Sequence, residues 1–308
     1  MSACLGIDTS NYTTSAAWVD AQSGQVVQEK QLLPVAPGQM GLRQSDAVFH
    51  HVRQLPDVLE RLRERCPEPF SCVAASERPQ EREGSYMPCF LTGWGAAREI
   101  AAAMGLPCYS VTHQQGHVAA AALGAGRLDL LERPFLAFHV SGGTTDALAV
   151  EPSSQSIITC RVVARSLDLK AGQLIDRVGG LLGLPFPAGP ALEELALQAQ
   201  ESYSPRVPVK DGCCSLSGVQ NQCETMQKKG VPAAQIARYC LDCVLAAIDG
   251  MTKALLQNYP NRPLLYAGGV MSNRLLRQAL EEKYGGSFAP PAYSADNAVG
   301  VALLGSLR

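Results

Sequence analysis

Two histidines one helical turn apart are the residues of this chain whose spacing most directly indicates chemistry. In the stretch "THQQGHVAAAALG", Gln115 follows Thr112 by three residues, which is the capping-box pattern of a helix start. His113 and His117 then lie on one face of the helix, and two imidazoles at this spacing can share one metal ion. The alternative, two histidines on a helix surface without a metal, stays open at this point.

A metal ion needs further ligands, and the stretch "YSADNAVG" near the C-terminus offers Asp296. Two histidines and one carboxylate leave coordination positions open for the phosphate oxygens of a ligand, as a catalytic or substrate-holding ion requires. The candidate metal ligands are therefore His113, His117 and Asp296.

A glycine-rich turn, "SGGTT" from Ser141 to Thr145, is a second candidate site. Glycines let backbone N–H groups approach an anion closely and the hydroxyls add donors, which suits a phosphate, although an ordinary hairpin turn has the same composition. The surrounding stretch "LAFHVSGGTTDALAV" matches "LGIDTSNYTTSAAWV" at six of fifteen positions after a shift of 131 residues. A nucleotide phosphate chain lying between two such turns would use both, so the repeat favours phosphate binding.

Two further polar residues could contact a ligand. "LLYAGGVMSNRLLRQAL" indicates a strand, a Gly-Gly turn and a helix capped by Ser272 or Asn273. The glycines allow a base or ribose to lie against the backbone, with Asn273 as its hydrogen-bonding partner. Asp176 in "GQLIDRVGG" could accept hydrogen bonds from ribose hydroxyls. A plain strand-to-helix junction and a solvated aspartate are the structural alternatives.

The elements that must position these residues alternate between strand pairs and helices, which predicts a mixed α/β fold. A chain of 308 residues suggests about two domains, and the repeat makes this specific. We expect a first domain of residues 1–132 plus 292–308 and a second of residues 133–291, sharing a cleft. The expected helices include 46–65, 96–105, 171–183 and 273–285, and the expected strands include 71–76 and 263–270.

Composition excludes several classes of protein. With 46% hydrophobic and 18% charged residues the chain is not of the disordered type, and a net charge of −2 gives no general attraction to nucleic acid or anionic membranes. The basic stretch "RLRERC" has interleaved glutamates, which favours a solvated helix face over an RNA contact. No apolar run reaches the roughly 18 residues of a membrane span.

The eleven cysteines lie mostly in apolar contexts. The N-terminus has no basic flank, apolar segment or cleavage site, so we expect a cytoplasmic protein with reduced thiols. Cys240 and Cys243 form one C-x-x-C pattern inside a long apolar helix, where core packing is favoured over metal or redox chemistry.

These motifs together resemble one family, the TsaD-type tRNA threonylcarbamoyladenosine transferases of the actin-like ATPase superfamily, formerly called O-sialoglycoprotein endopeptidases. The similarity is collinear from about Leu5 to Gly305. "HQQGH" is similar to the family's H-x-E-G-H metal motif and "HVSGGTTD" to its V-S-G-G-H-T loop. "GQLIDRVGGLLGLPFPAGPALEELA", "LSGVQN", "AGGVMSNRLLR" and "YSADNAVGVALLG" resemble further family segments in the same order.

The resemblance implies a duplicated actin-like, ribonuclease H-like fold with an adenylate in an interdomain cleft. Family enzymes transfer the threonylcarbamoyl group of threonylcarbamoyl-adenylate to N6 of adenosine 37 in tRNA. By matching position, His113, His117 and Asp296 would hold one iron or zinc ion. The loop His139, Val140, Ser141, Gly142 and Gly143 would face the phosphates, and Asp176, Gly189, Glu193 and Asn273 would contact ribose and adenine.

The resemblance also implies partners and a ligand. We expect an adenine nucleotide or threonylcarbamoyl-adenylate as the ligand and tRNA as the acceptor. We also expect partner subunits of a threonylcarbamoylation complex or a second copy of the chain. We expect no association with a membrane.

Four positions depart from the family pattern. Tyr12 stands where the family has an acid, Gln115 replaces the glutamate of the metal motif, Thr144 a histidine and Gln173 a glutamate. The catalytic residue is therefore unassigned. Two alternatives follow: a diverged paralogue that uses the same pocket on another acceptor or as an ATPase, and a non-catalytic actin-like partner subunit. A peptidase is disfavoured, because no glutamate follows His113 as in an H-E-x-x-H helix.

Overall fold

The computed structural model describes residues 3–10, 12–34, 42–294 and 298–308. The chain divides into two compact units. Unit 1 comprises Met1–Arg133, Glu151–Cys160 and Ala292–Arg308, and unit 2 comprises Pro134–Val150 and Arg161–Pro291.

Unit 1 is built on a five-stranded mixed sheet with the order β3-β2-β1-β4-β5. Strands β1 and β2 form the first hairpin and β3 continues it in antiparallel pairing, whereas β4 and β5 add on in parallel. The strands are β1 (Ala3–Ser10), β2 (Thr13–Asp20), β3 (Gln25–Leu32), β4 (Cys72–Arg78) and β5 (Cys108–Thr112).

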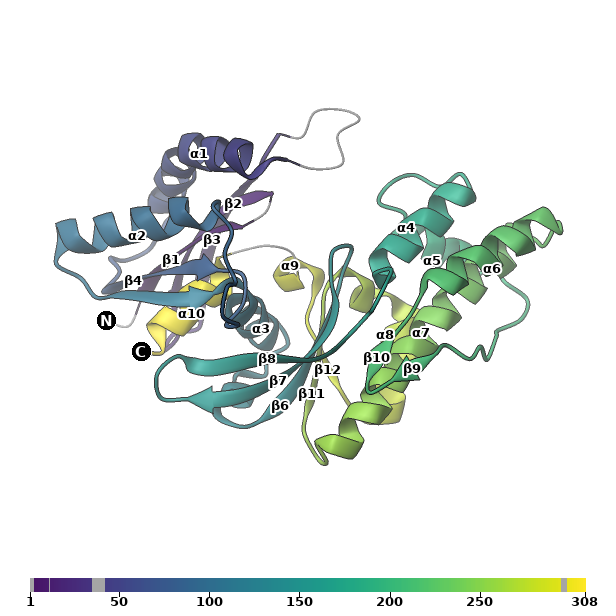
Figure 1. Cartoon of the computed structure of the whole chain (residues 1–308). Helices are drawn as coiled ribbons and strands as arrows, with labels where there is room; N and C mark the ends of the chain where they lie inside the picture. Colours follow the sequence, from purple (N-terminus) through teal and green to yellow (C-terminus); the bar gives the residue numbers. More distant parts are fainter. Residues whose placement is uncertain (1–2, 11, 35–41, 295–297) are drawn as a thin grey trace. The chain divides into compact units, whose positions relative to one another are not determined.

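Helices cover both faces of this sheet (Figure 1). Leu5 and Ile7 of β1 join a core with α1 and α2, whereas the intervening Gly6 faces α10, as the period of two in a strand requires. The helical segments are α1 (Gln44–Arg65), α2 (Phe90–Met104), α3 (His113–Gly124), η1 (Leu128–Glu132), α9 (Pro291–Ser294) and α10 (Val299–Ser306), with α3 and α10 packed together.

Unit 2 repeats the plan of unit 1. Read from β8, its sheet has the order β8-β7-β6-β11-β12. This matches the order β3-β2-β1-β4-β5 of the first sheet, with β6, β7, β8, β11 and β12 as the counterparts of β1, β2, β3, β4 and β5. Leu136 pairs with Ala149 in the second hairpin as Leu5 pairs with Trp18 in the first, so the 131-residue repeat extends to the register. The strands are β6 (Phe135–Val140), β7 (Thr145–Ser153), β8 (Ile157–Arg165), β11 (Leu264–Ala267) and β12 (Ser287–Phe288), with a separate ribbon of β9 (Val209–Lys210) and β10 (Cys213–Cys214).

The core of unit 2 forms between the sheet and its helices. Leu136, Phe138 and Val140 of β6 pack into one cluster with these helices. Cys240 and Cys243 are fully buried in that cluster, which confirms core packing for the C-x-x-C pattern. The helical segments are α4 (Ala171–Leu181), α5 (Gly189–Ala196), α6 (Ser217–Lys228), α7 (Ala233–Asn258), η2 (Gly269–Ser272) and α8 (Arg274–Tyr284).

The start of α2 differs from the sequence-based expectation. The expected start of this helix is residue 96, but the helix already begins at Phe90. A Cβ atom at Gly93 would lie 2.8 Å from the Thr9 hydroxyl oxygen, so this glycine permits close contact with β1 and does not interrupt the helix.

Two other expectations concern the surface. Arg61 and Arg65 in the basic stretch of α1 form ion pairs with Glu29 of β3, in keeping with a solvated helix face. No helix among the described residues has the length and hydropathy of a membrane span.

Candidate functional site

The predicted histidine pair lies at the first turn of α3 in unit 1. The Thr112 side chain accepts a hydrogen bond from the Gln115 N–H and the Gln115 side chain accepts one from the Thr112 N–H, which confirms the capping box. The two Nε2 atoms of His113 and His117 are 2.9 Å apart, within hydrogen-bond distance, so the two imidazoles point these nitrogens toward each other.

Asp8 of β1 orients this pair. Because β1 alternates its side chains, Asp8 lies on the same face of the sheet as Gly6, where α3 and α10 pack. Its Oδ2 atom is 2.8 Å from Nδ1 of His113, and its Oδ1 atom accepts a hydrogen bond from the Ser10 N–H. A carboxylate at Nδ1 holds the imidazole proton there and leaves Nε2 as a lone-pair donor.

Sequence reasoning did not assign Asp8 to the site. A signal was present, because an aspartate in an otherwise apolar strand is rarely buried without a partner, and Asp8 is 1% exposed. What the sequence lacked was the identity of that partner, His113, which lies 105 residues away.

The two histidines of unit 1 have the spacing of two of the ligands of a metal site. Two nitrogens bound to one tetrahedral zinc ion lie about 3.3 Å apart, close to the separation observed here. The histidine oriented through its other nitrogen by a carboxylate is the usual outer-shell arrangement of metal ligands. Asp296, the third predicted ligand, lies outside the described residues, and among the described residues no three His, Cys, Asp or Glu side chains form a metal-binding group.

Gln115 is turned away from the histidine pair. Its side-chain N–H₂ group donates to Glu81 and to the backbone carbonyl of Ile158, at 2.7 Å each. The second Glu81 oxygen accepts a hydrogen bond from the Cys160 N–H at 2.6 Å. Burial raises the pKa of the Glu81 carboxyl above its ordinary value. Gln115 therefore joins the start of α3 to two other segments of unit 1.

The two glutamate-to-glutamine departures share one structural role. Gln173 occupies the third position of α4, and its side chain accepts a hydrogen bond from the Lys170 N–H as that of Gln115 does from Thr112. Either a glutamine or a glutamate oxygen can accept this bond. At position 115, however, a glutamate would place a carboxylate against Glu81 and a carbonyl oxygen, so glutamine fits the site better.

A pocket of about 400 Å³ in unit 2 brings together several predicted ligand contacts. Gly142 of the glycine loop, Asp176 of α4, Gly189 and Glu193 of α5 and Asn273 before α8 all line it. The volume lies within the roughly 300–1,000 Å³ of small-molecule sites.

The glycine loop adjoins the start of α4. A Cβ atom at Gly172 would lie 2.6 Å from the Gly142 nitrogen, so glycine is required for this approach, whereas no atom of the described residues lies within 4 Å of a Cβ atom built at Gly142 or Gly143. The Ser141 N–H donates to the Thr144 carbonyl at 2.7 Å and closes the turn. Backbone N–H groups in such a loop at a helix N-terminus are suited to a phosphate.

Other members of the predicted phosphate loop do not line this pocket. The Val140 side chain is fully buried in the core of unit 2, and His139 is paired in β6 with Asp146 and Ala267. Their contribution to a phosphate site would therefore be through the backbone that sets the turn.

Each of the polar side chains at the pocket is held by hydrogen bonds to one of its oxygen atoms. Asp176 accepts a hydrogen bond from the Ala188 N–H through Oδ1, and Glu193 accepts from the N–H and Nε of Arg274 through Oε1. In the described part of the chain, the other carboxylate oxygen of each has no hydrogen-bond partner. Asn273 caps α8 through its oxygen, which leaves its NH₂ group as a donor. Arg274, which sequence reasoning did not single out, thus positions Glu193.

Tyr12 and Thr144 occupy turns of the two hairpins. The Tyr12 side chain is 42% exposed and its carbonyl accepts a hydrogen bond from the Leu33 N–H. Tyr12 therefore brings no carboxylate to the position where the family pattern has an acid, and Thr144 brings no imidazole to the position of the family's histidine.

Comparison with known proteins supplies the family context. A family model described as tRNA N6-adenosine threonylcarbamoyltransferase matches residues 35–303. Proteins of that name from Thermus thermophilus and Halalkalibacterium halodurans are 32% and 31% identical, over 97% and 91% of this chain and 90% and 82% of the relatives. A probable bifunctional tRNA threonylcarbamoyladenosine biosynthesis protein from Methanothermobacter thermautotrophicus is 28% identical over 99% of this chain and 55% of its own length.

Solved structures match the fold at lower identity. Full-length HypF in its phosphate- and nucleotide-bound form gives a TM-score of 0.60 at 14% identity, covering 99% of this chain and 54% of that one. Component A of the (R)-2-hydroxyglutaryl-CoA dehydratase of Acidaminococcus fermentans gives 0.56 at 16%, covering 99% and 98%. These matches show the actin-like ATPase fold and no more.

Proposed function

Because the chain belongs to the tRNA N6-adenosine threonylcarbamoyltransferase family, we propose that it performs the family reaction with the histidine pair of unit 1 and the pocket of unit 2. The chain is a transferase that modifies adenosine 37 of tRNA. The group transferred is threonylcarbamoyl, carried by threonylcarbamoyl-adenylate, and the acceptor is N6 of the adenine.

In this proposal the metal ligands are His113, His117 and Asp296. The ion, iron or zinc, supplies a Lewis acid for the phosphate or carbamoyl oxygens of the adenylate. Asp8 holds His113 so that its Nε2 lone pair is available. The observation that supports this step is the convergence of the two Nε2 atoms at 2.9 Å with a buried carboxylate behind one of them.

The pocket of unit 2 holds the nucleoside part of the adenylate. The unoccupied oxygens of Asp176 and Glu193 accept hydrogen bonds from ribose hydroxyls, and the Asn273 NH₂ group donates to the adenine. Gly189 allows the ligand to approach the backbone, since no atom of the described residues lies within 4 Å of a Cβ atom built there. The loop from His139 to Gly143 faces the phosphate through its N–H groups. Arg274 compensates part of the negative charge of Glu193.

The proposal extends to partners and compartment. The chain acts on tRNA together with partner subunits or a second copy of itself. It works in the cytoplasm, where its eleven free thiols stay reduced.

Complementation of a strain that lacks its own transferase tests this function. Production of the chain with its normal partners should restore threonylcarbamoyladenosine in digested tRNA, measured by mass spectrometry, and the His117→Ala variant should not restore it. The His50→Ala variant, which changes a histidine of α1, is the matched control and should behave as the wild type. Failure of the wild-type chain, present in folded form, would instead favour a paralogue that uses another acceptor, for which Tyr12 at the family's acidic position is the supporting observation.

A further inference from the structure

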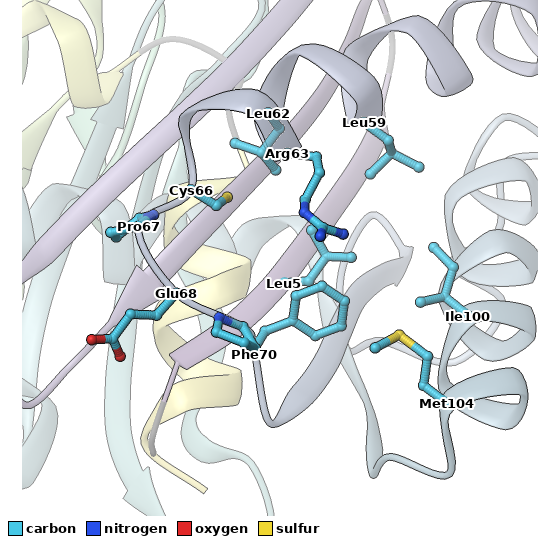
Figure 2. Close-up of a pocket in the computed structure, with 11 residues that line it drawn as sticks. Leu5, Leu59, Leu62, Arg63, Cys66, Pro67, Glu68, Phe70, Ile100 and Met104 are labelled. Atoms are coloured by element: carbon cyan, nitrogen blue, oxygen red, sulfur yellow. The ribbon is translucent and has the colours of Figure 1, made fainter.

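Unit 1 contains a pocket that lies apart from the residues proposed for the transferase function. It has a volume of about 530 Å³ and opens between the C-terminal parts of α1 and α2 and the segment 66–70 that leads into β4 (Figure 2). None of its lining residues belongs to the histidine pair, to Asp8 or to the network of Gln115. Its size is within the range of small-molecule sites.

The walls of this pocket are apolar. Leu5 of β1 and Leu62 of α1 form a buried base, at 5% and 2% exposure. Phe70, Ile100 and Met104 line the sides, and Figure 2 shows their side chains beside the same space. Apolar surface around an empty space lacks van der Waals partners, so an apolar ligand would gain contacts here.

One cation faces this space. Figure 2 shows the Arg63 guanidinium turned toward Leu5 and Phe70. Arg61 and Arg65 of the same helix are paired with Glu29, whereas Arg63 has no ion pair within the described residues. Glu68 also lines the pocket, but its carboxylate extends away from the space in Figure 2. The pocket therefore combines apolar walls with one unpaired positive charge.

The ends of the helices restrict the charge of a ligand. Helix α1 ends at Arg65 and α2 ends at Met104, so both present C-terminal turns to the pocket. These turns carry partial negative charge, whereas phosphates bind preferentially at helix N-termini. These turns disfavour a multiply charged phosphate more than a singly charged carboxylate, which one guanidinium can bind through two parallel hydrogen bonds.

We propose that this pocket binds a medium-chain aliphatic carboxylate. The alkyl chain lies against Leu5, Leu62 and Ile100, and the carboxylate pairs with Arg63. This site is independent of the tRNA reaction, because it shares no residue with the proposed catalytic machinery.

Calorimetric titration of the full chain with decanoate, below its micelle concentration, tests the proposal. Decanoate should bind, whereas butanoate, which lacks the chain, and decan-1-ol, which lacks the charge, should each bind at least about tenfold more weakly. Arg63→Gln should weaken decanoate binding by about tenfold or more. The matched control is Arg53→Gln, which removes an arginine of the same helix that lies over the Phe49 ring, and it should leave the affinity unchanged.

A second variant removes the space and keeps the charge. Leu59→Trp should fill the pocket and abolish decanoate binding while the circular dichroism spectrum and melting transition show a folded protein. The proposal is overturned if wild type does not bind decanoate, if Arg63→Gln binds it as tightly as wild type, or if decan-1-ol binds equally well. It is also overturned if the wild type forms a dimer that Leu59→Trp dissociates, because the pocket would then be a protein contact.

Discussion

At the level of single residues, the geometry of the histidine pair depends on Asp8. The carboxylate is buried, contacts Nδ1 of His113 and is itself held by the Ser10 N–H. An asparagine at this position would keep the size and could still accept from Ser10, but its neutral oxygen would be a weaker partner for the imidazole N–H.

We expect Asp8→Asn to lower the affinity for Zn²⁺ by about 10- to 100-fold, as loss of an outer-shell carboxylate does in other metal sites. Competition with a chromophoric chelator measures this affinity without reference to activity. Asp57→Asn, at an exposed position of α1, is the control and should bind Zn²⁺ as the wild type does. Equal affinities for Asp8→Asn and wild type would remove Asp8 from the metal site.

The hydrogen bonds of Gln115 predict that a negative charge at this position lowers the stability of the fold. Gln115→Glu should destabilise the fold by about 1–3 kcal/mol, because two carboxylates and a carbonyl oxygen would then meet where an amide now donates two hydrogen bonds. Urea unfolding at pH 7.5 measures the change. Adding Glu81→Gln to this variant exchanges the carboxylate and the amide and should recover most of the loss.

Gln173→Glu is the matched control for this series. It makes the same substitution at the same helix position in α4, where the side chain is exposed and, among the described residues, has the Lys170 N–H as its only hydrogen-bond partner, so the free energy of unfolding should change little. If Gln115→Glu were as stable as wild type, the contact between Gln115 and Glu81 would contribute nothing to the free energy of unfolding.

The sequence could predict contacts between residues close together along the chain but not contacts between distant ones. The spacing of His113 and His117 and the cap of Thr112 and Gln115 are local helix geometry, and both predictions are confirmed as structure. Asp8 and Glu81 lie 105 and 34 residues from their partners, so only the fold brings them together. The roles of Asp296, Asp176, Gly189, Glu193 and Asn273 in binding stay predictions.

At the level of elements, α3 is placed by close packing against α10. A Cβ atom at Gly300 would lie 1.8 Å from the Gly116 carbonyl oxygen and 2.7 Å from the Ala120 nitrogen. A Cβ atom at Gly116, the motif glycine between the two histidines, would lie 3.0 Å from Cγ2 of Val301 in α10, so this glycine also permits the close packing, which periodicity alone could not show.

Gly300→Ala should therefore separate the two helices and cost at least about 2 kcal/mol of unfolding free energy, since the clash is with backbone. Gly95→Ala in α2, where nothing lies within 4 Å of the added Cβ, should be neutral or stabilising by up to about 1 kcal/mol. Thermal melting of both variants measures the difference. Equal melting temperatures would contradict the packing argument.

His51 of α1 makes the stability of the fold depend on pH. Its Nδ1 atom lies 2.8 Å from the Thr14 hydroxyl oxygen, and burial lowers its pKa to about 4 from the ordinary 6.5. Protonation therefore favours the unfolded chain, which binds the proton first as the pH falls.

The contribution of His51 is fully present above pH 6.5 and is lost progressively between pH 6.5 and 4, by about 3 kcal/mol at most. Urea unfolding across this range should show a smaller loss in His51→Gln than in wild type. His50→Gln, at the neighbouring position, should follow the wild type. A parallel pH dependence of all three proteins would show that His51 is not buried in neutral form.

At the level of the whole molecule, duplication explains the fold. The 131-residue repeat predicted two units of similar plan, and the common strand order and hairpin register follow from it. Each unit carries a different part of the proposed chemistry: the histidine pair on α3 in unit 1 and the glycine loop with its pocket in unit 2. The repeat could not predict that Glu151–Cys160 is part of unit 1, because Glu81 and Gln115 hold that segment through its backbone.

The most direct test of the central claim is the affinity for a non-hydrolysable threonylcarbamoyl-adenylate analogue, measured by calorimetry with Zn²⁺ present. Wild type should bind the analogue, and His117→Ala in unit 1 and Asp176→Asn in unit 2 should each weaken binding by at least about tenfold. Retained wild-type affinity in both variants, with Zn²⁺ bound to the wild type, would contradict the assignment of the adenylate to these residues.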